Sequence, residues 1–144
     1  MDRRISRKTD NRFEVLSQDA TMGTMGIFKK RHKAAQLSSS DEFEQLLTEG
    51  KPVLVDFMKY GCSPCQIMDG IVNEVADEFQ EEAIVVKANL DKVPELFSKF
   101  KVRSTPTFVL LTPQGNGLHQ RWRQSGLVKK DVIVTNVQRA IEKV

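Results

Sequence analysis

Cysteine is scarce in this chain, and that scarcity excludes a fold held together by disulfides. The 144 residues include two cysteines, two histidines and one tryptophan. A small secreted domain that depends on disulfides needs several cysteine pairs, so we do not expect a structural disulfide here. Zinc usually takes four protein ligands, or three and a water molecule, so this composition also argues against a metal site.

Long apolar runs are missing as well, which argues against a membrane span and a secretory signal. A transmembrane helix needs roughly 20 consecutive apolar residues, and no run in this sequence approaches that length. Near the start, Ile5 and residues 13–16 do not form the continuous apolar core of a signal peptide. We therefore expect a soluble protein in a reducing compartment, the cytoplasm, with organellar targeting by the basic N-terminus as the alternative.

Positive charge is concentrated at the start of the chain. Residues 1–37 hold nine Lys and Arg against four Asp and Glu, whereas residues 38–144 hold thirteen against fifteen. The basic clusters of the first segment have few apolar neighbours. We predict a flexible basic extension over residues 1–37 that is a solvated tail; contact with a nucleic acid, a membrane surface or a targeting receptor is the alternative. A folded domain is predicted over residues 38–144.

The rest of the chain alternates between helical and extended patterns. The predicted elements are helices at about 39–50, 66–79, 94–100 and 131–143, strands at 53–58, 83–90, 107–111 and 119–124, a turn at 113–117, and a short extra strand near 34–37. The 53–58 strand is apolar on both faces apart from Asp56, as expected for a central strand covered on both sides. This order predicts an α/β fold, a central mixed β-sheet flanked by helices on both faces.

The two cysteines lie two residues apart, between a predicted strand and a predicted helix. The motif is Cys62-Ser63-Pro64-Cys65. A helix N-terminus offers free N–H groups and a partial positive charge, which stabilise a thiolate and lower the pKa of its thiol. Pro64 needs no N–H donor in a first helical turn, so it fits there and stiffens the loop. The motif therefore predicts reactive thiols, with an inert buried pair as the alternative.

Several separated segments together resemble the thioredoxin family over residues 38–144. They are residues 55–57, the cysteine motif, residues 86–91, residues 102–108, and the glycine at 126. The resemblance implies the thioredoxin fold and thiol–disulfide exchange, by a protein-disulfide reductase that cycles between a dithiol and a Cys62–Cys65 disulfide. A disulfide oxidase or isomerase, and a non-catalytic thioredoxin-fold binding module, are the alternative functions.

The same resemblance implies a role for each catalytic residue. Cys62 would be the nucleophile that attacks a substrate disulfide, and Cys65 would resolve the mixed disulfide. Asp56 would be a buried proton acceptor and donor for the Cys65 thiol, because burial raises the pKa of a carboxyl group. Lys87 on the neighbouring strand would be the partner of Asp56. The alternative is a buried Asp56–Lys87 ion pair with no part in catalysis.

Substrate-binding positions also follow from the resemblance. Thr105 and Pro106 would form a cis peptide bond that faces the disulfide, and their backbone would pair with an extended substrate segment. A trans proline that opens an edge strand is the alternative. Gly126 would permit close backbone approach near the same face. The other predicted contacts surround the thiol pair: Tyr60, Gly61, Ser63 and Pro64.

The chain departs from the family's usual residues beside the thiols. Gly61 and Met58 stand where many members have Trp, Ser63 replaces a Gly, and Gln66 replaces a common Lys. These changes leave the thiol chemistry intact and bear on redox potential, substrate range and recognition by a reductase.

Partners follow from the resemblance too. It implies no cofactor and no metal, disulfide-containing protein substrates, and an electron donor similar to thioredoxin reductase. We expect a monomer that binds no nucleic acid.

Overall fold

A mixed sheet organises residues 32–144, which are the residues that this computed structural model describes. Its strands follow the order β1-β3-β2-β4-β5, so β2 lies at the centre. β1 (Ala35–Gln36) and β2 (Val53–Met58) run parallel to β3 (Ile84–Asn89). β4 (Thr107–Gln114) runs antiparallel to β2 and to β5 (Gly117–Ser125). The predicted mixed sheet is confirmed.

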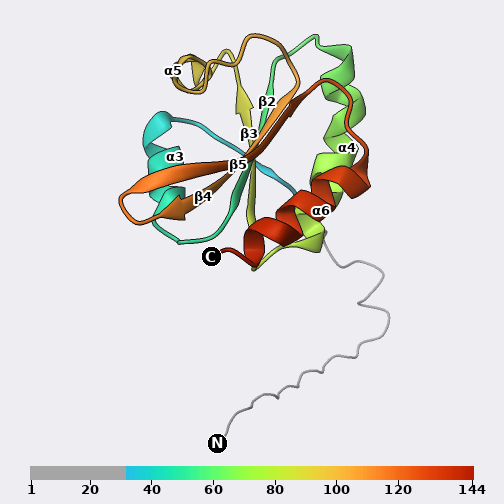
Figure 1. The fold of residues 1–144 in the computed structure, drawn as a ribbon. Coiled ribbons are helices and arrows are strands. Elements are labelled where there is room, and N and C mark those ends of the chain that lie inside the picture. Colours follow the sequence, from blue (N-terminus) through green and yellow to red (C-terminus); the bar gives the residue numbers. More distant parts are fainter. Residues whose placement is uncertain (1–31) are drawn as a thin grey trace, which may run out of the picture. The chain divides into compact units, whose positions relative to one another are not determined.

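Helices cover both faces of this sheet, as Figure 1 shows. α4 (Ser63–Glu78) and α6 (Lys130–Ile141) pack on one face. α3 (Ser40–Leu47) and α5 (Pro94–Lys99) pack on the other. Successive side chains of a strand point to opposite faces, so β2 contributes alternately to the two layers. The predicted α/β fold with helices on both faces is therefore confirmed.

Two apolar cores lie between the sheet and the helices. The core under α4 and α6 includes Leu54, Met68, Val72, Phe108 and Ile133. The core under α3 and α5 includes Phe43, Val53, Val55, Phe57 and Leu96. Each fully buried apolar side chain stabilises the fold by about 1.5–3 kcal/mol relative to an exposed one. The two cores together hold β2 rigidly from both sides.

α4 begins earlier than its apolar periodicity predicts. The pattern places the start at Gln66, yet the helix begins at Ser63 with Cys62 as its N-cap. The first turn contains Ser63 and Pro64, which carry no apolar repeat, so the pattern cannot register it. A proline is well accommodated in this turn because its missing N–H would have had no helical partner. Both cysteines therefore lie at the start of the helix.

The β4–β5 hairpin is longer than predicted. The strand predicted at 107–111 continues to Gln114, and its partner begins at Gly117. Pro113 pairs with Leu118, so the turn is tighter than the predicted 113–117 segment. Proline is acceptable there because it lies at the end of the paired region, where a ladder hydrogen bond can be spared.

The N-terminal edge of the sheet is β1, which confirms the short strand predicted near 34–37. Ala35 and Gln36 pair with β3, and Leu37 is buried beside them. The sheet thus already includes residues on the N-terminal side of the predicted boundary between 37 and 38. The flexible extension predicted for the start of the chain falls mostly on residues 1–31, which lie outside the described residues and are not tested.

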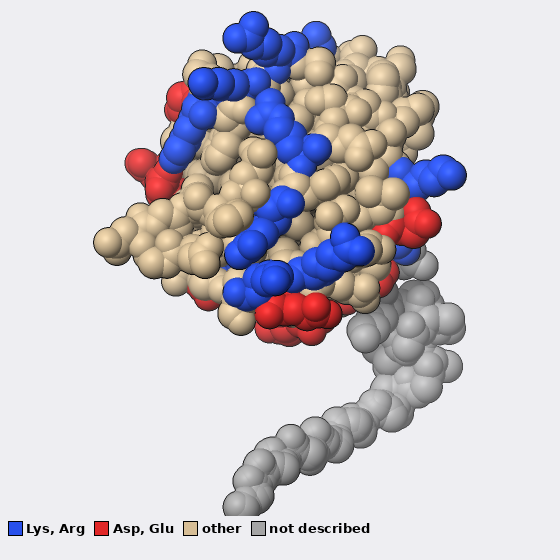
Figure 2. Space-filling model, viewed as in Figure 1, with Lys and Arg blue, Asp and Glu red and all other residues tan. Residues whose placement is uncertain are grey.

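The described helices include none that is both long and apolar enough to cross a membrane. Figure 2 shows Lys and Arg side chains spread over the face formed by β5 and α6, with acidic side chains near its margins. Arg123 of β5 has a structural role. The Arg123 guanidinium on β5 donates hydrogen bonds to the carbonyl oxygens of Phe100 and Lys101, and so ties the edge strand to the end of α5.

Candidate active site

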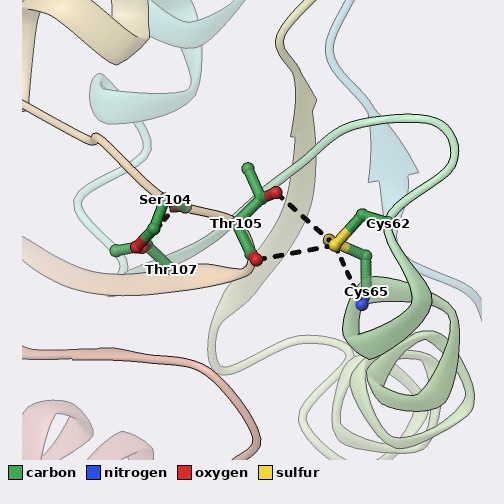
Figure 3. Close-up of a disulfide and its surroundings, with 5 residues drawn as sticks. All are labelled: Cys62, Cys65, Ser104, Thr105 and Thr107. Atoms are coloured by element: carbon green, nitrogen blue, oxygen red, sulfur yellow. Dashed lines mark hydrogen bonds between the residues drawn. A yellow bond between two sulfur atoms is a disulfide. The ribbon is translucent and has the colours of Figure 1, made fainter.

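A disulfide joins Cys62 and Cys65 across the first turn of α4 (Figure 3). Cys62 has extended backbone and caps the helix, and the Cys65 N–H donates a hydrogen bond of 3.2 Å to Cys62 Sγ. The two cysteines are 7% and 4% exposed, respectively. Since the free N–H groups of a helix start favour a negative charge, this sulfur position favours a thiolate once the disulfide is reduced.

Thr105 faces Cys62 from the loop that leads into β4. Its hydroxyl Oγ1 donates a hydrogen bond of 3.4 Å to Cys62 Sγ, and its carbonyl oxygen lies 3.5 Å from the same sulfur. The peptide bond between Thr105 and Pro106 is cis. The structure therefore brings together the cysteine motif and the Thr105–Pro106 segment, as the sequence predicts.

Gly126 lies on the far side of the same proline. Its N–H donates a hydrogen bond of 2.8 Å to the carbonyl oxygen of Pro106. Its φ of 86° is favourable only for glycine, whereas a Cβ built there would meet no atom within 4 Å. The conformation, and not close packing against the protein's own backbone, is what requires glycine at this position.

Thr107 is a site residue that the sequence analysis missed. Its hydroxyl Oγ1 donates to the carbonyl oxygen of Ser104 at 2.8 Å and accepts from the Ser125 hydroxyl at 2.7 Å. Thr107 is 1% exposed, so both bonds are shielded from water. It fixes the loop before Pro106 against the end of β5. In the sequence, Thr107 is a threonine directly after a proline. That position by itself indicates a β-branched strand residue and nothing about the loop.

Asp56 lies in the middle of β2, on the face that α4 covers. Its side chain is 1% exposed, and its Oδ1 atom has no hydrogen-bond partner within the protein. Burial raises the pKa of the Asp56 carboxyl group from 3.8 to about 7; the nearby Lys87 ammonium opposes that rise and the Asp69 carboxylate adds to it. Asp56 can therefore exchange a proton near neutral pH.

Lys87 lies beside Asp56 in register on β3, but its ammonium group is bound elsewhere. Lys87 Nζ forms an ion pair with Asp69 of α4. Asp56 and Lys87 are therefore neighbours, as predicted, but the structure shows no direct ion pair between them. Asp69 is a second residue that the sequence analysis missed. Its signal was its position four residues after Cys65, which places both side chains on one helix face.

A cavity of about 220 Å³ opens beside the disulfide. It is lined by Met58, Lys59, Tyr60, Gly61, Cys65, Gln66 and Asp69. Tyr60 at its rim is 65% exposed, and Leu127 after Gly126 is 59% exposed. Ser63 and Pro64 are exposed on the first turn of α4. Exposed apolar groups around a thiol pair can contact another protein.

The described residues contain no group of three or more His, Cys, Asp or Glu side chains that could hold a metal ion. The groups that the described residues place at this site are the sulfur pair, the buried Asp56 carboxyl group and the hydrogen-bond donors around Cys62 Sγ.

Comparisons with known proteins agree on one family. A family model described as Thioredoxin matches residues 33–139. The chain is 41% identical over 81 residues to Thioredoxin Y1, chloroplastic, of Arabidopsis thaliana, covering 56% of this chain and 47% of that protein. It is also 36% identical over 94 residues to a thioredoxin of Rickettsia bellii, covering 61% of this chain and 89% of that one.

A solved structure gives the same result. A mutant thioredoxin from Halobacterium salinarum matches with a TM-score of 0.67 and 27% identity, over 78% of this chain and 94% of that one. The chain spans about half the length of the Arabidopsis relative.

Proposed function

The chain belongs to the thioredoxin family, and we propose that it is a protein-disulfide reductase that cycles between a dithiol and the Cys62–Cys65 disulfide. The observation that carries this proposal is the redox-capable sulfur pair at the start of α4, opposite Thr105 and the cis Pro106 and near a buried acid. Each of these features has a use in sulfur chemistry: a nucleophile, a backbone that can pair with a substrate, and a proton acceptor.

In the first step, the Cys62 thiolate attacks one sulfur of a substrate disulfide. A bond forms between Cys62 and that sulfur, the substrate disulfide breaks, and the second substrate sulfur leaves as a thiolate. The Cys65 N–H and the Thr105 hydroxyl, which lie 3.2 and 3.4 Å from Cys62 Sγ, stabilise the attacking thiolate. The helix start adds its partial positive charge.

In the second step, Cys65 resolves the mixed disulfide. Asp56 accepts the proton of the Cys65 thiol, and the resulting thiolate attacks Cys62 Sγ. The Cys62–Cys65 bond forms, the bond to the substrate breaks, and the substrate leaves as its second thiolate. Two electrons have passed from the dithiol to the substrate. A carboxyl group with a pKa of about 7 suits this transfer, because a substantial fraction of it is ionised at neutral pH and that fraction is basic enough to take a proton.

Substrates bind, in this proposal, along the segment that precedes β4. The Thr105 backbone pairs with an extended stretch of the substrate, as in strand addition. Tyr60, Gly61, Ser63 and Pro64 contact the substrate from the thiol side, and Gly126 and Leu127 from the other. The exposure of Tyr60 and Leu127 supports an apolar docking surface around the disulfide.

Electrons return to the pair from a separate reductase similar to thioredoxin reductase, and the domain needs no cofactor or metal of its own. We expect the protein to act as a monomer without a nucleic-acid partner.

Two locations in the cell are candidates for this protein: the cytoplasm, which the sequence predicts, and an organelle. The name of the Arabidopsis relative supports the organellar one for this chain. Imaging of the full chain and of residues 32–144, each fused to a fluorescent protein, distinguishes the two.

The test of the proposed function is the reduction of a model protein disulfide by wild type and two single variants. Cys62→Ser should abolish the reaction, whereas Cys65→Ser should accumulate a mixed disulfide that is visible as a mass increase. Retained activity in Cys62→Ser would overturn the assignment. A binding module would instead keep its affinity for its partner when both cysteines are replaced by serine.

The direction of electron flow is tested by the reduction potential of the pair in glutathione or dithiothreitol buffers. A value of roughly −270 mV supports a reductase, whereas about −120 to −180 mV supports an oxidase or isomerase.

A further inference from the structure

Three charged or titratable side chains meet on the face of the sheet that α4 covers. Asp56 and Lys87 are register partners on β2 and β3, so their side chains leave the sheet on the same face. Asp69 reaches the same place from α4, four residues after Cys65. Two carboxyl groups therefore share one ammonium group, and the ion pair is made with Asp69.

We propose that Asp69 is a positioning residue: its carboxylate, which lines the cavity beside Cys65, holds the Lys87 ammonium group and keeps it from pairing with the buried Asp56. The inference rests on the proposed function, in which Asp56 takes the proton of Cys65. It adds a residue that acts through Lys87 and touches neither sulfur nor substrate.

The difference in burial explains why Lys87 pairs with Asp69. The Asp69 side chain is 50% exposed, so water still solvates its carboxylate and the ion pair has a small desolvation penalty. The Asp56 side chain is almost fully buried, and its Oδ1 atom has no partner. A direct Asp56–Lys87 pair would have to move the ammonium group, now on a side chain 13% exposed, deeper into the protein. Without Asp69, the buried carboxylate would be the remaining anion within reach.

Proton transfer depends on where this ammonium group lies. An ammonium group bonded directly to Asp56 would stabilise its ionised form and lower its pKa. Asp56 would then be a weaker base toward the Cys65 thiol, since an ordinary cysteine thiol has a pKa near 8.5. With Lys87 held by Asp69, burial dominates and the pKa of Asp56 stays at about 7.

Among the described residues, Lys87 and Asp69 are the charged groups that act on the pKa of the Asp56 carboxyl group. On β4, the register partner of Asp56 is Phe108, which is apolar. α4 contributes Cys65, which is held in the disulfide, and Asp69. Lys59 lines the cavity and is a charged group of the β2–α4 loop. The proposal therefore concerns one cation, Lys87, and the choice between two anions.

The experiment is a titration of the Asp56 carboxyl carbon by NMR, on the full chain with the Cys62–Cys65 disulfide intact. No cysteine titrates in this state, and no substrate is needed, so the result does not depend on the proposed function. Asp69→Asn should lower the titration midpoint of Asp56 by about one pH unit, because Lys87 becomes free to pair with it and the charge of Asp69 itself is lost. An unchanged midpoint would overturn the proposal.

The chain offers a matched control on the same helix. Glu74 is 51% exposed and pairs with Lys130, so Glu74→Gln removes the same charge and the same kind of ion pair, from a site where a different lysine is the partner. The Asp56 midpoint should stay where it is in wild type. An equal fall in Glu74→Gln would mean that net charge, and not the position of Lys87, controls Asp56.

A second pair of variants tests whether Asp69 acts through Lys87. Lys87→Met removes the cation and should raise the Asp56 midpoint. In that background, Asp69→Asn should have less than half of its effect in wild type, because there is no ammonium group to release. A fall of the same size in both backgrounds would show that Asp69 acts only by its own field, which overturns the positioning role.

The kinetic consequence is measured separately, on reduced protein mixed with a model disulfide. At neutral pH, Asp69→Asn should prolong the life of the mixed disulfide several-fold while the rate of Cys62 attack changes little. A failure of wild type to exchange at all would instead refute the proposed function and leave the titration result standing.

Discussion

The two faces of β2 bury different kinds of side chain. Toward α3 and α5, the strand presents Val53, Val55 and Phe57, all within an apolar core. Toward α4 and α6, it presents Leu54, then Asp56, whose carboxyl group has an unpaired buried oxygen. One face of the strand thus buries only apolar side chains, whereas the other also buries a carboxyl group, which lowers stability. The difference marks the face of the strand that carries the candidate site, since groups with strongly shifted pKa values cluster at functional sites.

Truncation of the apolar face should have the largest effect on stability. Phe57 is fully buried, with Phe97 at 5.0 Å and Phe100 at 5.9 Å between ring centroids. Phe57→Ala should therefore lower the free energy of unfolding by about 3–5 kcal/mol, toward the upper end of that range, measured by denaturant unfolding. The reduction potential of the folded fraction should not change.

Phe57→Leu is the milder control for this comparison, and it should cost roughly 1.5 kcal/mol or less if the neighbours repack. If Phe57→Ala instead shifts the reduction potential strongly, the two faces of β2 are not separate in function.

Replacement of the buried acid should have the opposite sign. The pKa of Asp56 is about 7 in the folded protein and 3.8 without the fold's influence, so the folded state holds the extra proton between these values. Stability should fall as the pH rises from about 4 to about 7, and stay low above that range. Asp56→Asn should therefore be more stable than wild type by about 3 kcal/mol at pH 8, allowing about 1 kcal/mol for the buried amide.

At pH 4 the stability of Asp56→Asn should lie within about 1 kcal/mol of wild type, because Asp56 is then largely protonated in the folded state and the small remaining gain is offset by the cost of the buried amide. Asp91→Asn, at an exposed position, is the control and should show no comparable gain at pH 8. Resolution of the mixed disulfide should slow in Asp56→Asn. A stability difference that does not vary with pH would refute the raised pKa.

The comparison of the two faces also shows what a sequence can predict. The β2 strand, the helical stripe of α4 and the mixed sheet follow from apolar periodicity, since each element must bury one face. Asp56 stands out because an acid interrupts an apolar run. These features are local, so the pattern of residue types suffices to predict them.

Thr107 and Asp69 could not be predicted in the same way. Thr107 acts by linking Ser104 to Ser125, residues from either side of the β4–β5 hairpin that only the fold brings together. Asp69 resembles any half-exposed polar residue of a helix until Lys87 is seen to reach it. Their roles depend on tertiary contacts between elements, and periodicity carries no information about those contacts.

Thr107 allows a third test, which compares two buried threonines of β4, one at the candidate site and one remote from it. Thr107→Val removes the hydroxyl that links Ser104 and Ser125 and should cost about 1–2 kcal/mol of stability. The loop before Pro106 should also loosen, so the KM for a protein disulfide should rise. Thr112→Val is a matched control on β4, because Thr112 is equally buried and accepts a hydrogen bond from Arg121 at 2.9 Å.

The Thr112→Val control should lose similar stability with no change in KM. Equal changes in KM for the two variants would mean that Thr107 has no particular role at the site. Steady-state reduction of one protein disulfide by both variants decides between these outcomes.

Gly126 should show an effect on stability no larger than that of Thr107, and the sharpest contrast with a remote position. Gly126 and Gly115 have φ values of 86° and 58°, and a Cβ at either would meet no atom within 4 Å. Alanine at each should therefore cost about 1–2 kcal/mol through backbone strain alone. Only Gly126→Ala strains the residue whose N–H bonds to the Pro106 carbonyl oxygen, so only it should slow disulfide reduction, by a few-fold. Equal rates in the two variants, measured beside their unfolding curves, would mean that the Gly126–Pro106 hydrogen bond does not position the substrate segment.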